Sequence, residues 1–259
     1  MFLAKTEEEV ELLKLNNDLV SRTLAEVARL IQPGVTTLAL DKRAEEFIRD
    51  NGASPGFLGY NGYPKTLCTS VNSAVVHGIP SSYVLKEGDI VSIDCGTFLH
   101  GFYGDSAYTF MVGEVSPEVQ RLLKVTRDCL ELGINKAVDG NRVGDISFEV
   151  QSHAESNGYS VVRELVGHGI GKMMHEKPEV PNYGARGRGP KLVNGMAICI
   201  EPMINMGAKH IFQENDGWTI KTADGKPSAH FELAVVIRKG KAERLSTFKY
   251  IEEALQKLN

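Results

Sequence analysis

The sequence predicts a mixed α/β (α+β) fold in which two related halves form one domain. The order helix, helix, strands occurs twice along the 259 residues, with a break near residues 113–116. Each half also carries one His-Gly-Ile triplet, at 77–79 and at 168–170. A chain of this length can build one large domain. We therefore expect a single domain, residues 1–259, whose halves (about 1–113 and 114–259) meet at a central cleft.

In the first half, two helices precede the strands. Residues 6–31 carry apolar side chains at helical spacing, Thr6 and Glu9 form a capping box, and Pro33-Gly34 ends the helix. A second helix is expected at residues 37–50, before Asn51-Gly52. After a loop rich in glycine and tyrosine, three strand-like runs follow at residues 66–71, 89–98 and 101–112.

The second half repeats this order. Ser116-Pro117-Glu118 is a strong helix start, with serine as the cap and proline at the first helical position. Helices are expected at residues 117–138 and 144–157. Strand-like runs return at 159–166, 196–203, 219–222 and 231–239, and a short helix is expected at 251–258.

The composition is that of an ordinary globular protein, with 42% apolar and 24% charged residues. A formal net charge of −4 favours neither nucleic acid nor an anionic membrane as partner. The four cysteines (Cys68, Cys95, Cys129, Cys199) form no CxxC pair, which argues against a disulfide framework or a zinc knuckle. The first residues lack the apolar core of a secretion signal, and no run approaches the ~20 apolar residues of a membrane span. We expect a cytoplasmic monomer.

Two acidic residues stand in strand-like runs that a tight turn near residues 99–101 would join as a hairpin. These are Asp94 and Asp105. Across a two-residue turn, the numbers of facing residues have an odd sum, as 94 and 105 do. Both carboxylates are therefore expected on one face of the sheet, opposite or diagonal to each other. Like charges placed so repel unless a cation lies between them.

Two more acids, Glu201 and Glu232, border apolar runs. Any one such acid is most often solvated or ion-paired. Four of them together with His168 favour two divalent ions a few ångströms apart, with two bridging carboxylates. Because the donors are mostly hard oxygens, Mn²⁺, Fe²⁺ or Co²⁺ is expected at least as much as Zn²⁺.

The segment "VGHGIGKMMHEKP" (166–178) surrounds His168 with three glycines and places His175 just beyond. Glycine is costly to order, so a cluster of it indicates that something approaches the backbone closely. We expect that Gly167, Gly169 and Gly171 let the backbone pass near a substrate and aim His168 at a metal.

Six segments, in this order and spacing, resemble type I methionine aminopeptidases. They are "GYNGYPKTLCTSVNSAVVHGIP", "GDIVSIDCG", "GFYGDSAYTF", "GHGIGKMMHEKP", "GMAICIEPM" and "DGWTIKT". The resemblance covers nearly the whole chain and implies the pita-bread fold, a pseudo-twofold α/β structure with a curved antiparallel sheet backed by helices. The segment from His175 to Glu201 is too short for the extra subdomain of the type II enzymes, and no N-terminal extension precedes the helices.

The resemblance also implies the site residues. The family's metal ligands fall on Asp94, Asp105, His168, Glu201 and Glu232. Asp105 and Glu232 are expected to bridge two divalent ions (Mn, Fe, Co or Zn), whose bound hydroxide attacks the first peptide carbonyl of a polypeptide with an N-terminal methionine. Glu201 would also accept the water proton, His175 would stabilise the developing negative charge, and His77 would contact the scissile amide nitrogen.

By the same resemblance, the methionine pocket falls on Tyr60, Tyr63, Cys68, Met174 and Trp218. Phe57 and Met174 stand where well-known members carry cysteine and phenylalanine, so the pocket stays apolar but changes shape. The second residue of the substrate is expected to be small. A monovalent cation near Asn72 and Ser228 is a further implication.

The expected partners are the N-termini of nascent polypeptides, with no DNA and no membrane. The loop 182–191 carries Arg186, Arg188 and Lys191 among glycines. Such a loop is either simply solvated or, since these enzymes act on nascent chains, contacts ribosomal RNA.

Two rival functions remain open. One is a proline-specific aminopeptidase or creatinase-like hydrolase, which uses similar ligands but usually carries a large additional N-terminal domain. The other is a non-catalytic pita-bread protein that binds partners; such proteins lose ligands, whereas this chain keeps all five.

Overall fold

A nine-stranded sheet forms the centre of the fold in the computed structural model, which describes residues 4–257. Its main path is β1-β4-β5-β14-β9-β7-β8, with β2 paired to β4 and β15 paired to β14, and every pairing is antiparallel. The strands are β1 (Ser54–Pro55), β2 (Leu67–Val71), β4 (Ile90–Leu99), β5 (Phe102–Met111), β7 (Val166–Gly169), β8 (Glu176–Pro181), β9 (Ala197–Ile200), β14 (Glu232–Val236) and β15 (Glu243–Arg244).

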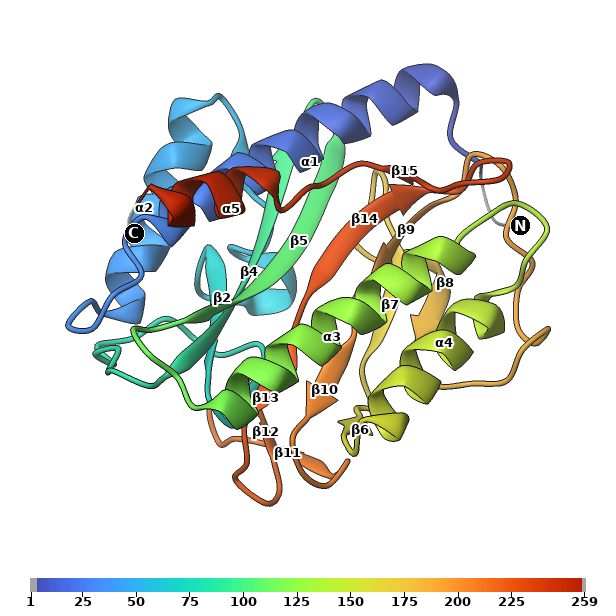
Figure 1. The fold of residues 1–259 in the computed structure, drawn as a ribbon. Coiled ribbons are helices and arrows are strands. Elements are labelled where there is room, and N and C mark those ends of the chain that lie inside the picture. Colours follow the sequence, from blue (N-terminus) through green and yellow to red (C-terminus); the bar gives the residue numbers. More distant parts are fainter. Residues whose placement is uncertain (1–3, 258–259) are drawn as a thin grey trace.

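Helices cover the sheet along its length (Figure 1). They are α1 (Glu7–Ala28), α2 (Thr37–Asp50), α3 (Pro117–Lys136), α4 (Val143–Ser156) and α5 (Lys249–Gln256), with a 3-10 turn η1 at Tyr60–Gly62. The helices α3 and α4 lie side by side, and α1 contacts α2, α5 and the strands β4 and β5. No helix between residues 4 and 257 is both long enough and apolar enough to cross a membrane.

Two small sheets flank the main one, in the orders β13-β10-β6 and β11-β12-β3. Their strands are β3 (Ala74–Val76), β6 (Ser160–Val161), β10 (Met203–Asn205), β11 (Ile211–Gln213), β12 (Ile220–Thr222) and β13 (Ser228–His230). Figure 1 places most of them below the main sheet, beyond the lower ends of β14 and β9.

The predicted helices are confirmed, with small differences at their ends. The capping box at Thr6 and Glu9 forms, and α2 has the predicted bounds. The helices α1 and α3 end a few residues early, at Ala28 and Lys136. The last helix, expected at 251–258, spans Lys249–Gln256, and residue 258 lies outside the described residues.

Two predicted strands are wrong as single elements. The run 196–203 divides into β9 and β10, because Pro202 has no N–H for a sheet ladder and the chain changes sheets there. The run 159–166 divides into β6 and the start of β7, separated by the polar pair Arg163-Glu164. The short strands β1, β3, β8, β11, β13 and β15 were not predicted.

The predicted hairpin is confirmed. His100 and Gly101 form its turn with φ of 53° and 81°, and Leu99 pairs with Phe102. Asp94 then faces Ala107, and Asp105 faces Gly96. The two carboxylates are therefore diagonal neighbours on one face of the sheet.

The two faces of the sheet bury different clusters. On β14, Leu233 and Val235 join the large core under the helices, whereas Ala234 and Val236 belong to a smaller cluster with Val10 and other residues of α1. This division follows from the alternation of side chains along a strand. Glu232 has the same parity as Ala234, so it lies on the face of this smaller cluster.

Among the glycines near His168, Gly167 allows close packing of strands, whereas a role of these glycines beside a substrate stays a prediction. A Cβ atom at Gly167 would lie far inside contact distance of the backbone carbonyl oxygen of Cys199 on β9. A Cβ atom at Gly171 would meet only the ends of the Lys5 and Glu176 side chains. The close approach is thus between segments of the chain itself.

Substitution of Gly167 by alanine is expected to destabilise the protein by about 1–3 kcal/mol, because two backbone segments would have to move apart. Gly171→Ala is the matched control, since flexible side-chain ends can move away. Urea or thermal unfolding of both variants measures the difference. Equal losses of stability would show that backbone crowding between β7 and β9 is not the constraint.

Candidate active site

Five adjacent strands of the main sheet each contribute one side chain to a common point. Asp94 lies on β4, Asp105 on β5, Glu232 on β14 and His168 on β7, while Glu201 directly follows β9. The strand order β4-β5-β14-β9-β7 makes these five elements neighbours. Ala107 on β5 pairs with both Asp94 and Glu232, so the small alanine separates these two carboxylates.

The donor atoms of this cluster face one another. His168 Nε2 lies 3.7 Å from Asp105 Oδ2 and 3.8 Å from Glu201 Oε1. Asp105 and Glu232 are 3% and 2% exposed. One oxygen each of Asp94, Asp105 and Glu232 is buried without a hydrogen-bond partner among the described residues.

Burial dominates the electrostatics of the cluster. It raises the pKa of Asp105, Glu201 and Glu232 well above the usual range, and the negative charges of the neighbouring carboxylates raise it further. Burial also raises the pKa of Asp94, although the nearby His230 opposes this shift. Without a cation, these groups can therefore not all be ionised at neutral pH.

The protonation of His168 is fixed by a backbone contact. Its Nδ1 lies 2.9 Å from the carbonyl oxygen of Gly169, which can only accept, so Nδ1 carries the hydrogen. Nε2 then presents its lone pair to the carboxylates, as a metal-ligating histidine does. Burial lowers the pKa of His168 to about 4, which keeps the imidazole neutral at pH 7.

These observations fit divalent cations. Crowded buried carboxylates with unpartnered oxygens are unfavourable alone and become favourable around a cation. The donors are four carboxylates and one neutral imidazole, a set that suits hard or borderline divalent metals. All five predicted ligands meet at this point of the sheet.

Two further residues of the cluster were missed from the sequence. Cys199 lies within 4.8 Å of donor atoms of Asp105, His168 and Glu232, and His230 lies equally close to Glu201 and Glu232. Both stand two positions before a predicted ligand, and residues two apart on an extended chain face the same side. Burial raises the pKa of Cys199 well above its usual value, so it stays a thiol and the donor set keeps its oxygen character.

A cavity of about 350 Å³ opens beside the cluster and is lined by the five predicted ligands, the two predicted active-site histidines and the five predicted pocket residues. Phe57, Tyr63, Cys68 and Met174 form a buried apolar group at this cavity, with Tyr60 and Trp218 packed against it. Tyr63 meets Trp218 edge to face at 5.0 Å, and its hydroxyl donates to the carbonyl oxygen of Leu67. The cavity therefore combines a charged region with an apolar one.

Two histidines border the charged region. His175 lies edge to face with His168, with ring centroids 4.4 Å apart, and its Nδ1 lies 2.9 Å from the Tyr60 hydroxyl. His77 adopts a left-handed backbone conformation (φ 58°), which is uncommon for a residue with a side chain. Burial lowers the pKa of both, that of His77 to about 4.

The two remaining predicted features lie away from the cluster. The Ser228 N–H donates to the Asn72 carbonyl oxygen at 2.9 Å, so these residues are neighbours, and a cation there stays a prediction. The loop 182–191 is mostly exposed, as the solvated reading predicts, and it is also tied to α4. Arg186 pairs with Glu149, and the Gly144 N–H donates to Arg188.

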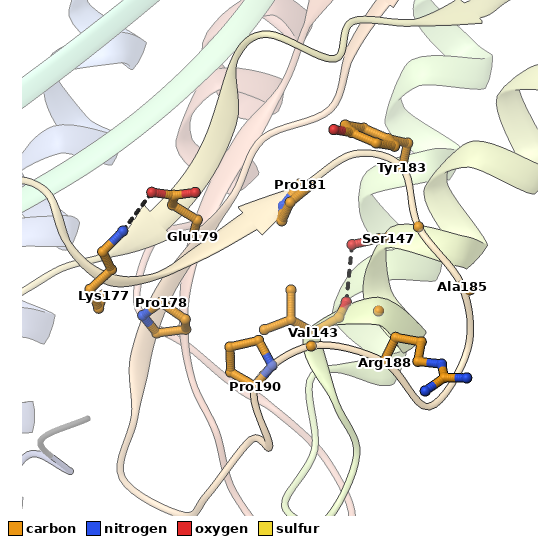
Figure 2. Close-up of a pocket in the computed structure, with 13 residues that line it drawn as sticks. Val143, Ser147, Lys177, Pro178, Glu179, Pro181, Tyr183, Ala185, Arg188 and Pro190 are labelled. Atoms are coloured by element: carbon orange, nitrogen blue, oxygen red, sulfur yellow. Dashed lines mark hydrogen bonds and ion pairs between the residues drawn. The ribbon is translucent and has the colours of Figure 1, made fainter. Parts of the chain in front are cut away.

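This loop borders a second cavity, also of about 350 Å³. Figure 2 shows Tyr183, Ala185 and Arg188 along the loop on one side of the view, and Pro178 and Glu179 of β8 on the other side. Its lining holds none of the predicted site residues except Arg188 of the loop.

Comparisons with known proteins place the chain in a family. The model of metallopeptidase family M24 matches residues 11–239. The chain is 50% identical to a methionine aminopeptidase of Clostridium perfringens, over 96% of this chain and 100% of that protein. The crystal structure of methionine aminopeptidase from Rickettsia prowazekii superposes with a TM-score of 0.94 at 40% identity, covering 95% of this chain and 100% of that one.

The chain therefore belongs to metallopeptidase family M24, and its predicted pita-bread fold is confirmed. An Xaa-Pro dipeptidase from Bacillus anthracis shares the fold at a TM-score of 0.78 and 23% identity, and this chain covers only 62% of it. Because the relatives at 40–50% identity are named methionine aminopeptidases, the rival proline-specific function is not favoured.

Acidity is expected to weaken metal binding. Because the carboxylate pKa values are raised, the free site holds protons that a cation must displace. For each proton displaced, the metal affinity is expected to fall about tenfold when the pH is lowered by one unit. His168 adds no proton above about pH 5, given its pKa of about 4. Calorimetric titration of the EDTA-treated protein with Mn²⁺ from about pH 6 to 8, in buffers of different ionisation enthalpy, counts the protons. Affinity independent of pH would contradict the raised pKa values.

Proposed function

We propose that this protein removes the N-terminal methionine from polypeptides with a small second residue. One observation carries the proposal. A single cavity is lined both by the cluster of four carboxylates and one imidazole and by an apolar pocket. The relatives at 40–50% identity, named methionine aminopeptidases, support the same reaction.

The cluster would hold two divalent ions, with Asp105 and Glu232 as the bridges. All four carboxylates line the cavity, and these two are more deeply buried than Asp94 and Glu201. When bound, such a pair polarises the substrate carbonyl and makes a nucleophile available at neutral pH. Glu201 borders both the cluster and the cavity, so its carboxylate can accept a proton from the attacking water and return it to the leaving amine.

The two cavity histidines would act on the substrate directly. His175 lines the cavity, where a neutral imidazole donating a hydrogen bond would stabilise the negative charge that develops on the scissile carbonyl. Its contact with Tyr60 holds the ring in place. His77 would contact the scissile amide nitrogen, and its constrained backbone fixes the direction of the side chain.

The apolar group would receive the methionine side chain. Tyr60, Tyr63, Cys68, Met174 and Trp218 line the cavity together with Phe57. An unbranched thioether suits a narrow apolar slot of this kind. Phe57 and Met174 touch the same region, so the two departures from the family pattern would compensate each other in volume.

We infer that the natural substrates are the N-termini of nascent polypeptides in the cytoplasm, and that the protein acts as a monomer. Contact of the loop 182–191 with ribosomal RNA remains part of this proposal.

We also infer one catalytic domain with two related halves. In support, the largest hydrophobic cluster contains both Leu24 of α1 and Leu130 of α3.

His175→Ala is expected to leave the metal content unchanged and to lower kcat by roughly 10²–10³, the loss typical of one oxyanion-type donor. Metal analysis by mass spectrometry and steady-state kinetics test this together. Loss of metal in the variant would instead make His175 a ligand and overturn the division of roles between His168 and His175.

Selectivity tests the function itself. Met-Ala and Met-Gly peptides are expected to be cleaved efficiently, and Met-Lys, Met-Phe and Leu-Ala peptides poorly. An apolar pocket discriminates by about 1–3 kcal/mol per methylene-sized difference, or about 10–200-fold in kcat/KM. If Leu-Ala or Met-Lys reacted as fast as Met-Ala, the protein would be a broader aminopeptidase. Preferential cleavage of a Met-Pro or Ala-Pro peptide would favour the proline-specific rival.

A further inference from the structure

His230 is a buried histidine at the end of β13, just before β14, beside Glu201 and Glu232 of the donor cluster. Its side chain is 1% exposed, and it is not among the residues that line the cavity. It therefore cannot touch a substrate in the cavity. Its Nε2 has no hydrogen-bond partner in the described part of the chain, although a buried polar nitrogen normally has one.

The nearest acceptor for this nitrogen is a predicted metal ligand. His230 Nε2 lies 3.4 Å from Glu201 Oε2, whereas the other oxygen, Oε1, lies 3.8 Å from His168 Nε2. The two oxygens of Glu201 thus face two different imidazoles. Oε1 faces His168 and Oε2 faces His230.

The backbone on both sides of this pair is held in place. The Thr109 hydroxyl accepts the His230 N–H and donates to the His230 carbonyl oxygen, at 2.9 and 2.7 Å. Asn182 donates to the Glu201 carbonyl oxygen at 3.0 Å. Because both backbones are anchored, a small rotation of either side chain is enough to shorten the 3.4 Å distance between His230 Nε2 and Glu201 Oε2 to that of an ordinary hydrogen bond.

We propose that His230 is a positioning residue whose Nε2–H donates to Glu201 Oε2 and so directs Oε1 toward the metal. This inference rests on the proposed metal centre. Partners that hydrogen-bond the outer oxygen of a ligand fix its orientation, and their loss typically costs 10–100-fold in metal affinity or activity. His230 lies outside the five expected ligands and the two expected active-site histidines.

The test compares His230→Leu, which keeps similar volume without a donor, with His230→Gln, which restores an N–H donor at similar reach. Calorimetric titration with Mn²⁺ alone and the visible spectrum of the Co²⁺-loaded protein are the readouts that do not depend on substrate. His230→Leu is expected to weaken Mn²⁺ binding by about 10–100-fold and to lower kcat with little change in KM, while His230→Gln recovers most of both. Wild-type affinity in the leucine variant, or equal defects in both variants, would overturn the proposal.

A double-mutant cycle shows whether His230 acts through Glu201. In a Glu201→Ala background, adding His230→Leu is expected to cause no further loss of Mn²⁺ affinity, and a further loss would overturn the proposal.

A crystal structure of the metal-loaded wild type removes any dependence on the folding of variants. It should show His230 Nε2 within about 3.2 Å of Glu201 Oε2; Nε2 bound to metal would make His230 a ligand instead. If the wild-type protein bound no metal, the proposed metal centre would be refuted. This result differs from each outcome that tests His230.

Discussion

Four carboxylates crowded into the interior are the constraint on which the rest of this structure depends. Asp94, Asp105, Glu201 and Glu232 repel one another and are largely removed from water, so their charged forms are costly without a cation. An empty cluster of this kind lowers the free energy of unfolding, and binding of a cation restores it. The site therefore indicates a bound metal before any comparison is made.

The fold explains how these groups are brought together from distant parts of the chain. Antiparallel strands lie only about 4.7–4.9 Å apart, so residues on five neighbouring strands can reach one point. The tight β4-β5 hairpin sets Asp94 and Asp105 on one face, and pairing of β14 with β5 adds Glu232 on the same face. Gly167 allows β7 to approach β9 closely, which brings His168 toward Glu201.

Much of this could be predicted from local rules. Helix caps are encoded within a few residues, and the parity of a two-residue hairpin gave the shared face of Asp94 and Asp105 correctly. The strand breaks were harder, because a run such as 196–203 looks continuous until Pro202 sends the chain to another sheet. Cys199 and His230 were missed for a related reason, since their neighbours across the sheet depend on long-range pairing. The glycines around His168 were correctly linked to a close approach, and at Gly167 the partner is the chain itself.

The central claim is that the cluster holds two divalent ions bridged by carboxylates, and anomalous X-ray diffraction tests it most directly. Crystals soaked in Mn²⁺ or Co²⁺ and measured at the absorption edge of that metal should show two peaks about 3.5–4 Å apart. Both should lie among Asp94, Asp105, His168, Glu201 and Glu232, with Asp105 and Glu232 touching each peak. The absence of any peak in the cluster at saturating metal, or a single peak that neither Asp105 nor Glu232 touches, would contradict the account.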